Sequence, residues 1–359
     1  MSTVLQLAGV SKSYGGVTAL KAVDLNIADN AYVTLLGPSG SGKTVLLRVI
    51  AGFELPDAGG ISFRGRALEH VPAHQRGIGF VFQNFALFPH LTVERNISYG
   101  LENRDLDPIK DPKVWRGRTK DIMDLVGLTG LAGRNVNQIS GGQRQRVALA
   151  RTLVTEPKLV LLDEPLGALD ANLRMRMRAE LRSIRERLGI PFLHVTGNES
   201  EALAMGDTVV VLDRGTIRQI ADPDTVYNRP ASPAVARFLN RYNLFSGAVT
   251  DRAFSSAQGR FAIADAPVVT TGGEHAYAIR YDRISVRPYG SAARDGEVHI
   301  EAAFVASEYT GASQLSFFAL PDGKVIEVES HVSQRAPERY EPQSRYSLVW
   351  NREAALVFV

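Results

Sequence analysis

The most constraining feature of the sequence is the segment GPSGSGKT at residues 37–44, which fits the pattern G-x-x-x-x-G-K-[ST]. An apolar run at residues 31–36 precedes it as a candidate strand, and residues 45–50 can follow it as a helix. Glycines there allow successive backbone N–H groups to turn toward one phosphate chain at the positive end of that helix. Lys43 would add a charge beside the β- and γ-phosphates, and the Thr44 hydroxyl would bind Mg²⁺. The residues predicted to contact the nucleotide are Gly37, Pro38, Ser39, Gly40, Ser41, Gly42, Lys43 and Thr44. The alternative is a glycine-rich strand-to-helix turn with a chance Lys-Thr; the phosphate loop is favoured because the pattern and its structural context agree.

A length of 359 residues exceeds one typical core and predicts two or three domains. Hydrophobic content of 45% and charged content of 22% are those of an ordinary globular protein and argue against long disorder. The chain has no cysteine, which excludes disulfides and thiolate metal sites and is compatible with a reducing compartment.

Residues 1–16 lack the pattern of a secretory signal, and no apolar run approaches the roughly 20 residues that span a bilayer. We therefore expect a cytoplasmic protein that touches a membrane only through a partner. The net charge of +3 does not by itself indicate nucleic acid. The seven histidines are scattered without the spacing of a transition-metal site.

Two adjacent carboxylates, Asp163 and Glu164, follow the apolar run at residues 158–162. Such a run is typical of a buried parallel strand, and the carboxyl end of that strand is where open α/β sheets bind ligands. Beside a phosphate loop, Asp163 would hold Mg²⁺, and Glu164 would orient or deprotonate the water that attacks the γ-phosphate. Taken alone, the dipeptide is equally compatible with an acidic turn.

A second anion-binding helix start is predicted at residues 140–143, whose sequence is Ser140, Gly141, Gly142 and Gln143. Ser140 is a good N-cap, and Val147, Ala150, Leu153 and Val154 would form the apolar face of the helix that it opens. A Ser-Gly-Gly at a helix start presents free N–H groups to an anion. One bound nucleotide does not obviously need both cradles.

Two further residues have open roles. Tyr14 lies in a polar turn, where its ring could stack on adenine or simply pack. Gln83 follows the apolar residues 78–82 and could offer its carbonyl to Mg²⁺ or water, although such a Gln is usually a surface residue. The segment 84–100 is rich in large apolar groups, so it either packs on its own domain or docks a partner.

The remaining pattern is helical at 111–134 and 171–188, with a strand at 192–196 and a hairpin at 208–220. The helix at 171–188 is rich in arginine, but acidic residues are interleaved and aromatic residues are absent, so a solvated face is favoured over nucleic acid. Composition changes near residues 228–233. After residue 233, strands are expected at 276–286, 297–307, 314–318, 324–328 and 346–350. These strands would form an all-β barrel or sandwich, to which we assign no catalytic residues.

Taken together, these residues resemble the nucleotide-binding subunit of an ATP-binding cassette (ABC) transporter. The resemblance covers roughly residues 4–239: the phosphate loop, Gln83, the signature SGGQ, the acid pair, and the segment Gly167, Ala168, Leu169 and Asp170. It implies an α/β ATPase domain of the P-loop type at 1–240, with a helical subdomain at about 84–155. It also implies ATP and Mg²⁺ as ligands, and two domains paired head to tail so that each signature covers the partner's ATP. By resemblance Tyr14 stacks on adenine, Gln83 links the metal to the permease and assists catalysis with Lys43 and Glu164, and Asp170 belongs to a loop at the dimer interface.

Residues 241–359 resemble the smaller all-β accessory domain, TOBE-like and similar to an OB barrel, of importers for sugars, polyamines and ferric iron. The matching pieces are Ala278, Ile279, Arg280 and Ile284, and Tyr309, Thr310 and Gly311 before a strand. The resemblance implies a peripheral ATPase on the cytoplasmic face of the inner membrane. Its partners would be a second copy, permease subunits and, indirectly, a solute-binding protein, but not nucleic acid.

The sequence departs from this family after the strand that ends in Thr196. The family usually has a histidine and then an acidic residue there, whereas this chain has Gly197 and Asn198. That histidine would contact the γ-phosphate, so slow hydrolysis is expected. His194 is not a substitute, because residues an odd number apart on a regular strand face opposite sides. Two alternatives to a transport ATPase stay open: a cassette acting on a soluble nucleic-acid or ribosomal complex, and an ATP-gated binding module with negligible turnover.

Overall fold

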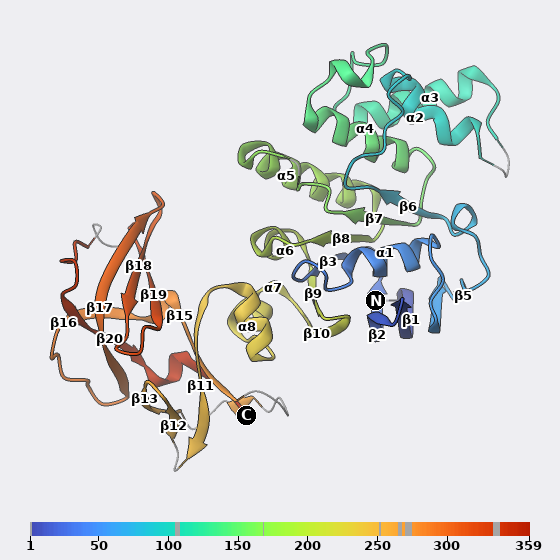
Figure 1. The fold of residues 1–359 in the computed structure, drawn as a ribbon. Helices are drawn as coiled ribbons and strands as arrows, with labels where there is room; N and C mark the ends of the chain where they lie inside the picture. Colours follow the sequence, from blue (N-terminus) through green and yellow to red (C-terminus); the bar gives the residue numbers. More distant parts are fainter. Residues whose placement is uncertain are drawn as a thin grey trace. The chain divides into compact units, whose positions relative to one another are not determined.

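The chain divides into two compact units, Met1–Tyr227 and Asn228–Val359 (Figure 1). The computed structural model describes residues 2–104, 108–167, 169–250, 253–264, 268–269, 275–332 and 338–359. The division falls before the boundary expected at 240/241. The physical cause is α8 (Pro233–Leu239), which packs against β11 (Tyr242–Thr250) and β15 (Ala276–Arg280) and so belongs with the second unit.

The first unit is built on a six-stranded sheet in which the strands are parallel except at one edge. Its order is β10 (Thr216–Ala221), β9 (Thr208–Asp213), β3 (Tyr32–Leu36), β8 (Phe192–Thr196), β7 (Leu159–Asp163) and β6 (Ile78–Val81). β10 pairs antiparallel with β9 as the predicted hairpin. β3, β7 and β8 are buried along their whole length, as expected of parallel strands covered on both faces.

Alternate residues of these strands enter two different cores. On β7, Leu159 and Leu161 join the cluster that contains α1 (Lys43–Ala51), whereas Val160 and Leu162 join the cluster of the larger helices. The α1 face also carries an antiparallel sheet with the order β2 (Val17–Ala28), β1 (Thr3–Tyr14), β4 (Ala58–Phe63) and β5 (Arg66–Ala67). The two faces of the central sheet are therefore covered by different layers.

The opposite layer is helical (Figure 1). It contains α2 (Val93–Glu102), α3 (Pro112–Leu125), α4 (Gly141–Leu153), α5 (Ala171–Leu188) and α6 (Glu199–Met205), with the short turns η1 (Ala73–Gln75) and η2 (Val136–Gln138) elsewhere in the unit. The helix expected at 111–134 ends at Leu125 because Gly127 follows with a φ of 67°, a left-handed conformation that suits glycine. Trp115 on α3 is buried, and the Arg95 guanidinium lies 5.1 Å from its ring centroid.

The second unit consists mainly of two antiparallel sheets around one core. The first sheet has the order β13 (Gly259–Ala262), β12 (Ala253–Ser256), β11, β15, β21 (Ala355–Phe358) and β14 (Val268–Val269), and β14 is parallel to β21. The second has the order β16 (Ser285–Pro288), β20 (Arg345–Asn351), β17 (Glu297–Tyr309), β18 (Ser313–Ala319) and β19 (Val325–His331). The buried Trp350 of β20 donates its indole N–H to the Tyr277 hydroxyl of β15 at 2.8 Å, joining the two sheets.

One expected strand of this unit is divided. Residues 276–286 form β15, then the turn η3 (Tyr281–Arg283), then β16 in the other sheet. The Arg280 guanidinium donates to the Asp282 carboxylate across the turn, from Nε at 2.8 Å. The short helices α7 (Pro223–Asn228) and α8 and the turn η4 (Arg352–Ala354) complete the elements. Within the described ranges, none of the helices combines the length and apolar character needed to cross a bilayer.

Candidate nucleotide site

The phosphate loop joins β3 to α1 in a conformation that depends on glycine. Gly40 and Gly42 have φ values of 77° and 103°, in the left-handed region that other residues rarely adopt. An ideal Cβ on Gly37 would lie 2.1 Å from the backbone oxygen of Leu212 on β9. The loop is therefore fixed against its neighbours before any ligand binds.

The Lys43 ammonium lies over this loop. Its Nζ donates to the Gly37 and Pro38 carbonyl oxygens at 2.8 and 2.9 Å. Burial lowers the pKa of Lys43, and the carboxylates of Glu164 and Asp163 oppose that shift. Since an ammonium has three donors, the loop uses two and a third can serve a phosphate oxygen.

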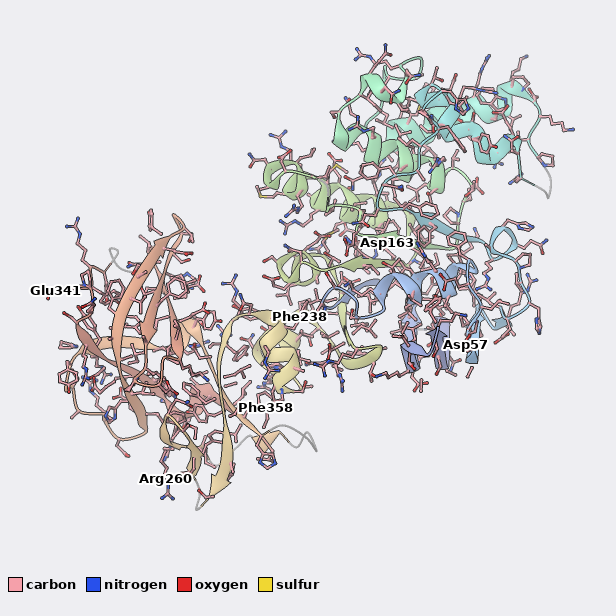
Figure 2. All side chains as sticks on the ribbon, viewed as in Figure 1. Asp57, Asp163, Phe238, Arg260, Glu341 and Phe358 are labelled. Carbon is pink, nitrogen blue, oxygen red and sulfur yellow. The ribbon has the colours of Figure 1, made fainter. Side chains whose placement is uncertain are left out.

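Oxygen ligands for a divalent cation meet beside the loop. The Thr44 hydroxyl donates to Asp163 Oδ1 at 3.2 Å, and Asp163 lies in the middle of the first unit (Figure 2). Burial raises the pKa of Asp163, and the Thr44 hydrogen bond opposes this. The described residues contain no group of three or more His, Asp or Glu side chains that could hold a metal by themselves. A hydroxyl and one carboxylate fit Mg²⁺ that also binds phosphate oxygens, which is how Mg²⁺ is usually held.

Glu164 occupies an uncommon backbone position. Its φ is 44°, and its N–H donates to the Val195 carbonyl oxygen of β8 at 3.1 Å. Non-glycine residues in this region cluster at functional sites, where the surrounding structure maintains the strain. Gln83 Nε2 donates to Glu164 Oε2 at 3.0 Å, so two of the predicted catalytic residues are in direct contact.

The predicted signature forms the start of α4. The Ser140 hydroxyl accepts from the Gln143 N–H at 3.3 Å, and Gln143 Oε1 accepts from the Ser140 N–H at 2.9 Å. This reciprocal pair is a capping box. Around Gly141, an ideal Cβ would come no closer than 3.9 Å to any neighbour. This helix start is therefore ordered but open.

Tyr14 is 44% exposed, as a ring available for stacking must be. The residue that holds its segment, Asp57, was not identified from the sequence. The Asp57 carboxylate accepts from Lys12 Nζ at 2.9 Å and from the Ser13 N–H at 2.7 Å (Figure 2). These bonds, with Lys12 first, lower the pKa of Asp57. Lys12 Nζ in turn lies 5.5 Å from the Tyr14 ring centroid.

The segment from Gln83 to Tyr99 divides between the two roles considered for it. Phe85 is buried in its own core, with 9% exposed. Phe88 is half-buried and packs on Tyr99 at 4.5 Å between ring centroids, and Tyr99 is 42% exposed. The backbone conformation of this segment depends on Arg151 and Asn96, whose side chains donate to its backbone carbonyls. The sequence did not reveal this role for either residue.

A second aromatic group lies on the other side of Gln83 in sequence. Phe53, just after α1, stacks on Phe82 with ring centroids 5.7 Å apart, and Phe80 contacts both rings. Phe53 is 49% exposed and Phe82 37%. Nothing in the sequence connects Phe53 with this surface, because Phe53 is far from Phe82 along the chain.

The end of β8 agrees with the expected direction of His194. Its Nδ1 lies 2.9 Å from the Tyr32 hydroxyl and its Nε2 lies 2.8 Å from Glu201 Oε1, all in the interior. Asn198, the residue that follows Gly197 in the departure from the family pattern, caps α6 by accepting from the Glu201 N–H at 2.8 Å. An ideal Cβ on Gly197 would meet no heavy atom within 4 Å.

The segment after the acid pair leads into α5. Asp170 caps this helix by accepting from the Leu173 N–H at 3.0 Å. Ala168 lies outside the described residues. Charged residues of α5 form ion pairs of both kinds: its Arg185 contacts Asp207 at 2.7 Å, and its Glu180 contacts Arg146 of α4 at 2.6 Å.

Comparison with known proteins identifies this arrangement. The sequence profile described as ABC transporter matches residues 20–167, and that of the TOBE domain matches residues 277–358. The spermidine/putrescine import ATP-binding protein PotA of Spiroplasma citri is 46% identical over 250 residues, which cover 69% of this chain and 70% of that protein. The sulfate/thiosulfate import ATP-binding protein CysA of Caulobacter vibrioides is 41% identical over 329 residues, covering 91% and 92%. The chain belongs to the ABC transporter family.

Solved structures agree with this assignment. The dimeric ATP-binding cassette MJ0796, in a post-hydrolysis state bound to ADP and Pi, matches with a TM-score of 0.55 and 31% identity over 61% of this chain and 98% of that one. A nucleotide-free cassette with 24% identity and a TM-score of 0.59 supports the fold alone. The predictions of an importer-type ABC ATPase and of a C-terminal all-β TOBE domain are confirmed.

Proposed function

We propose that this ABC ATPase powers import of a small solute through a membrane permease, at the cytoplasmic face of the membrane, with two copies closing head to tail on ATP. The observation that carries the proposal is the joint contact of Thr44 with Asp163 and of Gln83 with Glu164, beside a phosphate loop that already holds its lysine. These are the groups that ATP hydrolysis needs, and the import ATP-binding proteins PotA and CysA supply the analogy for transport.

Nucleotide binding follows from the loop. Backbone N–H groups at the start of α1 and the third donor of Lys43 would bind the phosphate chain, and Tyr14 would stack on the adenine. Thr44 and Asp163 would hold Mg²⁺, which would neutralise charge on the β- and γ-phosphates. The Gln83 amide nitrogen Nε2 donates to Glu164. The amide oxygen of Gln83 takes no part in this bond and could bind the ion or a water molecule.

Glu164 would act as the general base for the attacking water. Its left-handed backbone and its bond from Gln83 fix the carboxylate at the carboxyl end of β7, next to Asp163. Hydrolysis would be slow, because Gly197 supplies no imidazole and the Asn198 side chain is used by α6.

The second anion cradle supports pairing of two copies. The signature at the start of α4 belongs to the helical layer, while the phosphate loop contacts Leu212 of β9 and the β2 residue Ala19. The open N–H groups beside Gly141 would bind the γ-phosphate held by the other copy. The dimeric MJ0796 cassette bound to ADP and Pi gives a precedent within the family.

The permease would dock on the two aromatic groups that flank Gln83. Phe53 and Phe82 form one, and Phe88 with Tyr99 forms the other. Their exposed apolar area is suited to a partner's apolar segment, and its position next to Gln83 would connect docking to the catalytic residues. Phe85 is excluded from this surface because its own core buries it.

The solute would be recognised by other subunits, including a solute-binding protein. Relatives with comparable identity are named for spermidine and putrescine, which are cations, and for sulfate and thiosulfate, which are anions. Similar ATPase subunits are thus named for the import of solutes of opposite charge. We infer that the residues of this chain do not select the solute.

The first experiment measures ATP hydrolysis and sedimentation of the full chain with Mg²⁺ and ATP, comparing Glu164→Gln with the parent. Loss of a general base typically lowers the rate by about 10²–10⁴, while ATP still binds and a closed dimer accumulates. Glu186→Gln, an exposed glutamate on α5, is the matched control. Unchanged turnover in Glu164→Gln would remove its assignment as the base.

Docking is tested by transport and by co-purification with the permease. Phe88→Asp with Leu91→Asp, and separately Phe53→Asp, should abolish both while ATP binding persists. Val305→Asp, at an exposed apolar residue of β17, is the control. Survival of the complex in all these variants would move the docking site elsewhere.

The missing imidazole also supports a second candidate, an ATP-gated module with negligible turnover. In that case the dimer would close on ATP and reopen only as ATP dissociates. Turnover of the assembled complex distinguishes the two candidates, since import driven by hydrolysis requires continuous phosphate release.

A further inference from the structure

The backbone just after Gln83 is strained. Phe85 and Ala86 have φ values of 64° and 45°, so two successive non-glycine residues lie in the left-handed region. The Phe85 N–H closes a turn onto the Phe82 carbonyl oxygen at 2.9 Å, and this turn contains Gln83. Strain of this kind persists only where surrounding groups hold it in place.

Arg151 is the group that holds this turn. Its Nη1 donates to the Ala86 carbonyl oxygen at 2.7 Å and its Nη2 to the Phe85 carbonyl oxygen at 2.9 Å. Its guanidinium carbon lies 5.5 Å from the centroid of the Phe88 ring. Burial lowers the pKa of Arg151. The planar guanidinium gives each carbonyl its own N–H donor and presents a flat face to the Phe88 ring, a geometry that the single ammonium of lysine does not reproduce.

Arg151 also connects the signature with the segment after Gln83, because it lies on the signature helix and bonds that segment. It lies in the last turn of α4, the helix whose first residues form the signature. Phe85 is two residues beyond Gln83, whose amide bonds Glu164. We propose that Arg151 is a positioning residue that keeps Gln83 against Glu164. The proposal rests on the function assigned to Glu164 above.

The second half of the same segment has a separate clamp. Asn96 is fully buried, and its amide bonds the Phe88 N–H and carbonyl and the Thr92 carbonyl, at 2.8 to 3.1 Å. Asn96 thereby shapes the proposed docking half, whereas Arg151 shapes the half next to Gln83. This division predicts that loss of Arg151 affects turnover rather than nucleotide affinity.

The test is a double-mutant cycle on ATP hydrolysis by the full chain. Arg151→Lys should lower kcat on the order of tenfold or more, as small misplacements at reacting groups do, with KM within about twofold. In a Gln83→Ala background the same replacement should change kcat by less than about twofold, because the group that it positions is gone. Arg182→Lys is the matched control, since Arg182 also donates from a helix to a backbone carbonyl, that of Ala204 at 3.0 Å.

Equal effects in both backgrounds, or a change confined to KM, would overturn the proposal. Hydrogen exchange of the parent chain gives an independent reading that needs no variant or turnover. The Phe85 amide, which donates to the Phe82 carbonyl oxygen inside this turn, should exchange slowly like those of α4, and a rate typical of an exposed loop would refute the clamp. If the parent does not hydrolyse ATP, the proposed function fails while the exchange result still decides the role of Arg151.

Discussion

The two helix starts of the ATPase unit that carry glycine-rich anion cradles differ in what surrounds them. At α1, Gly40 and Gly42 adopt left-handed conformations, and the Lys43 ammonium fills the loop by bonding its carbonyls. At α4, Gly141 has no close neighbour and the capping box uses only Ser140 and Gln143. The first cradle needs glycine for its conformation, whereas at the second cradle Gly141 leaves the helix start open and Gly142 allows close packing on Leu173. The first is thus complete within one chain, whereas the second is an open surface suited to a ligand held by another copy.

Replacing Lys43 with alanine should break the first cradle alone. A hydrogen bond to a charged group contributes about 1.5–3 kcal/mol, so ATP affinity of the single chain should fall about 10–150-fold. Fluorescent-nucleotide titration measures this, with the surface variant Lys113→Ala as control. Retained affinity in Lys43→Ala would mean that the loop amides suffice.

Gly141→Asp should break the second cradle alone. The added carboxylate fits, because the nearest atoms to a Cβ are 3.9 Å away, and an acid suits the first turn of a helix. It would repel the γ-phosphate of the other copy, so the ATP-dependent dimer should weaken by at least about tenfold while single-chain ATP binding persists. The neutral variant Gly141→Asn separates charge from size. Loss of single-chain binding in Gly141→Asp would contradict the separation of the two cradles.

Gly197→His should supply the contact that the first cradle lacks. A donor at a developing charge is typically worth about 10²–10³ in rate, and the space around Gly197 is open, so turnover should rise at least about tenfold. Phosphate release by the assembled complex is the measurement. His194→Ala is the comparison: it should leave the rate per folded molecule nearly unchanged but lower stability, since it leaves Glu201 buried without its partner. A parent already turning over at about 1–10 s⁻¹, with no gain from Gly197→His, would show that the imidazole is dispensable.

The smallest effect concerns stability. Gly37→Ala should lower Tm by several degrees, since its Cβ would clash with the Leu212 carbonyl and overpacking costs about 1–3 kcal/mol. Gly141→Ala should leave Tm within about one degree, because it clashes with nothing. Thermal unfolding of the two variants compares them directly, and equal shifts would show that both helix starts are equally packed.

The glycine loop at residues 37–44 could be predicted because its conformational demands are expressed as residue types in a short, fixed spacing. The strand and helix around it and the direction of His194 likewise follow from local periodicity. Arg151 could not be predicted in its role, since its partner Ala86 is 65 residues away and nothing local distinguishes it from other arginines of α4. Asp57 and Phe53 were missed for the same reason.

The backbone conformation of the catalytic candidate Glu164 could not be predicted from the sequence either. The left-handed φ of Glu164 arises where β7 ends beside β8, a tertiary arrangement that residue type does not encode. The apolar segment after Gln83 was correctly singled out, but only packing decides that Phe85 enters the core while Phe88 and Tyr99 stay partly exposed. The domain boundary shifted because contacts of α8, rather than composition, determine to which unit it belongs.

The chain has two tryptophans, Trp115 in α3 and Trp350 in β20, so each unit carries one buried intrinsic fluorophore. Replacing either with phenylalanine yields a protein whose emission reports on the other unit alone. Denaturant titrations of these two single-tryptophan proteins would therefore follow the ATPase unit and the TOBE unit separately, without an added label. Coincident midpoints would identify one cooperative folding unit, and separate midpoints would identify two.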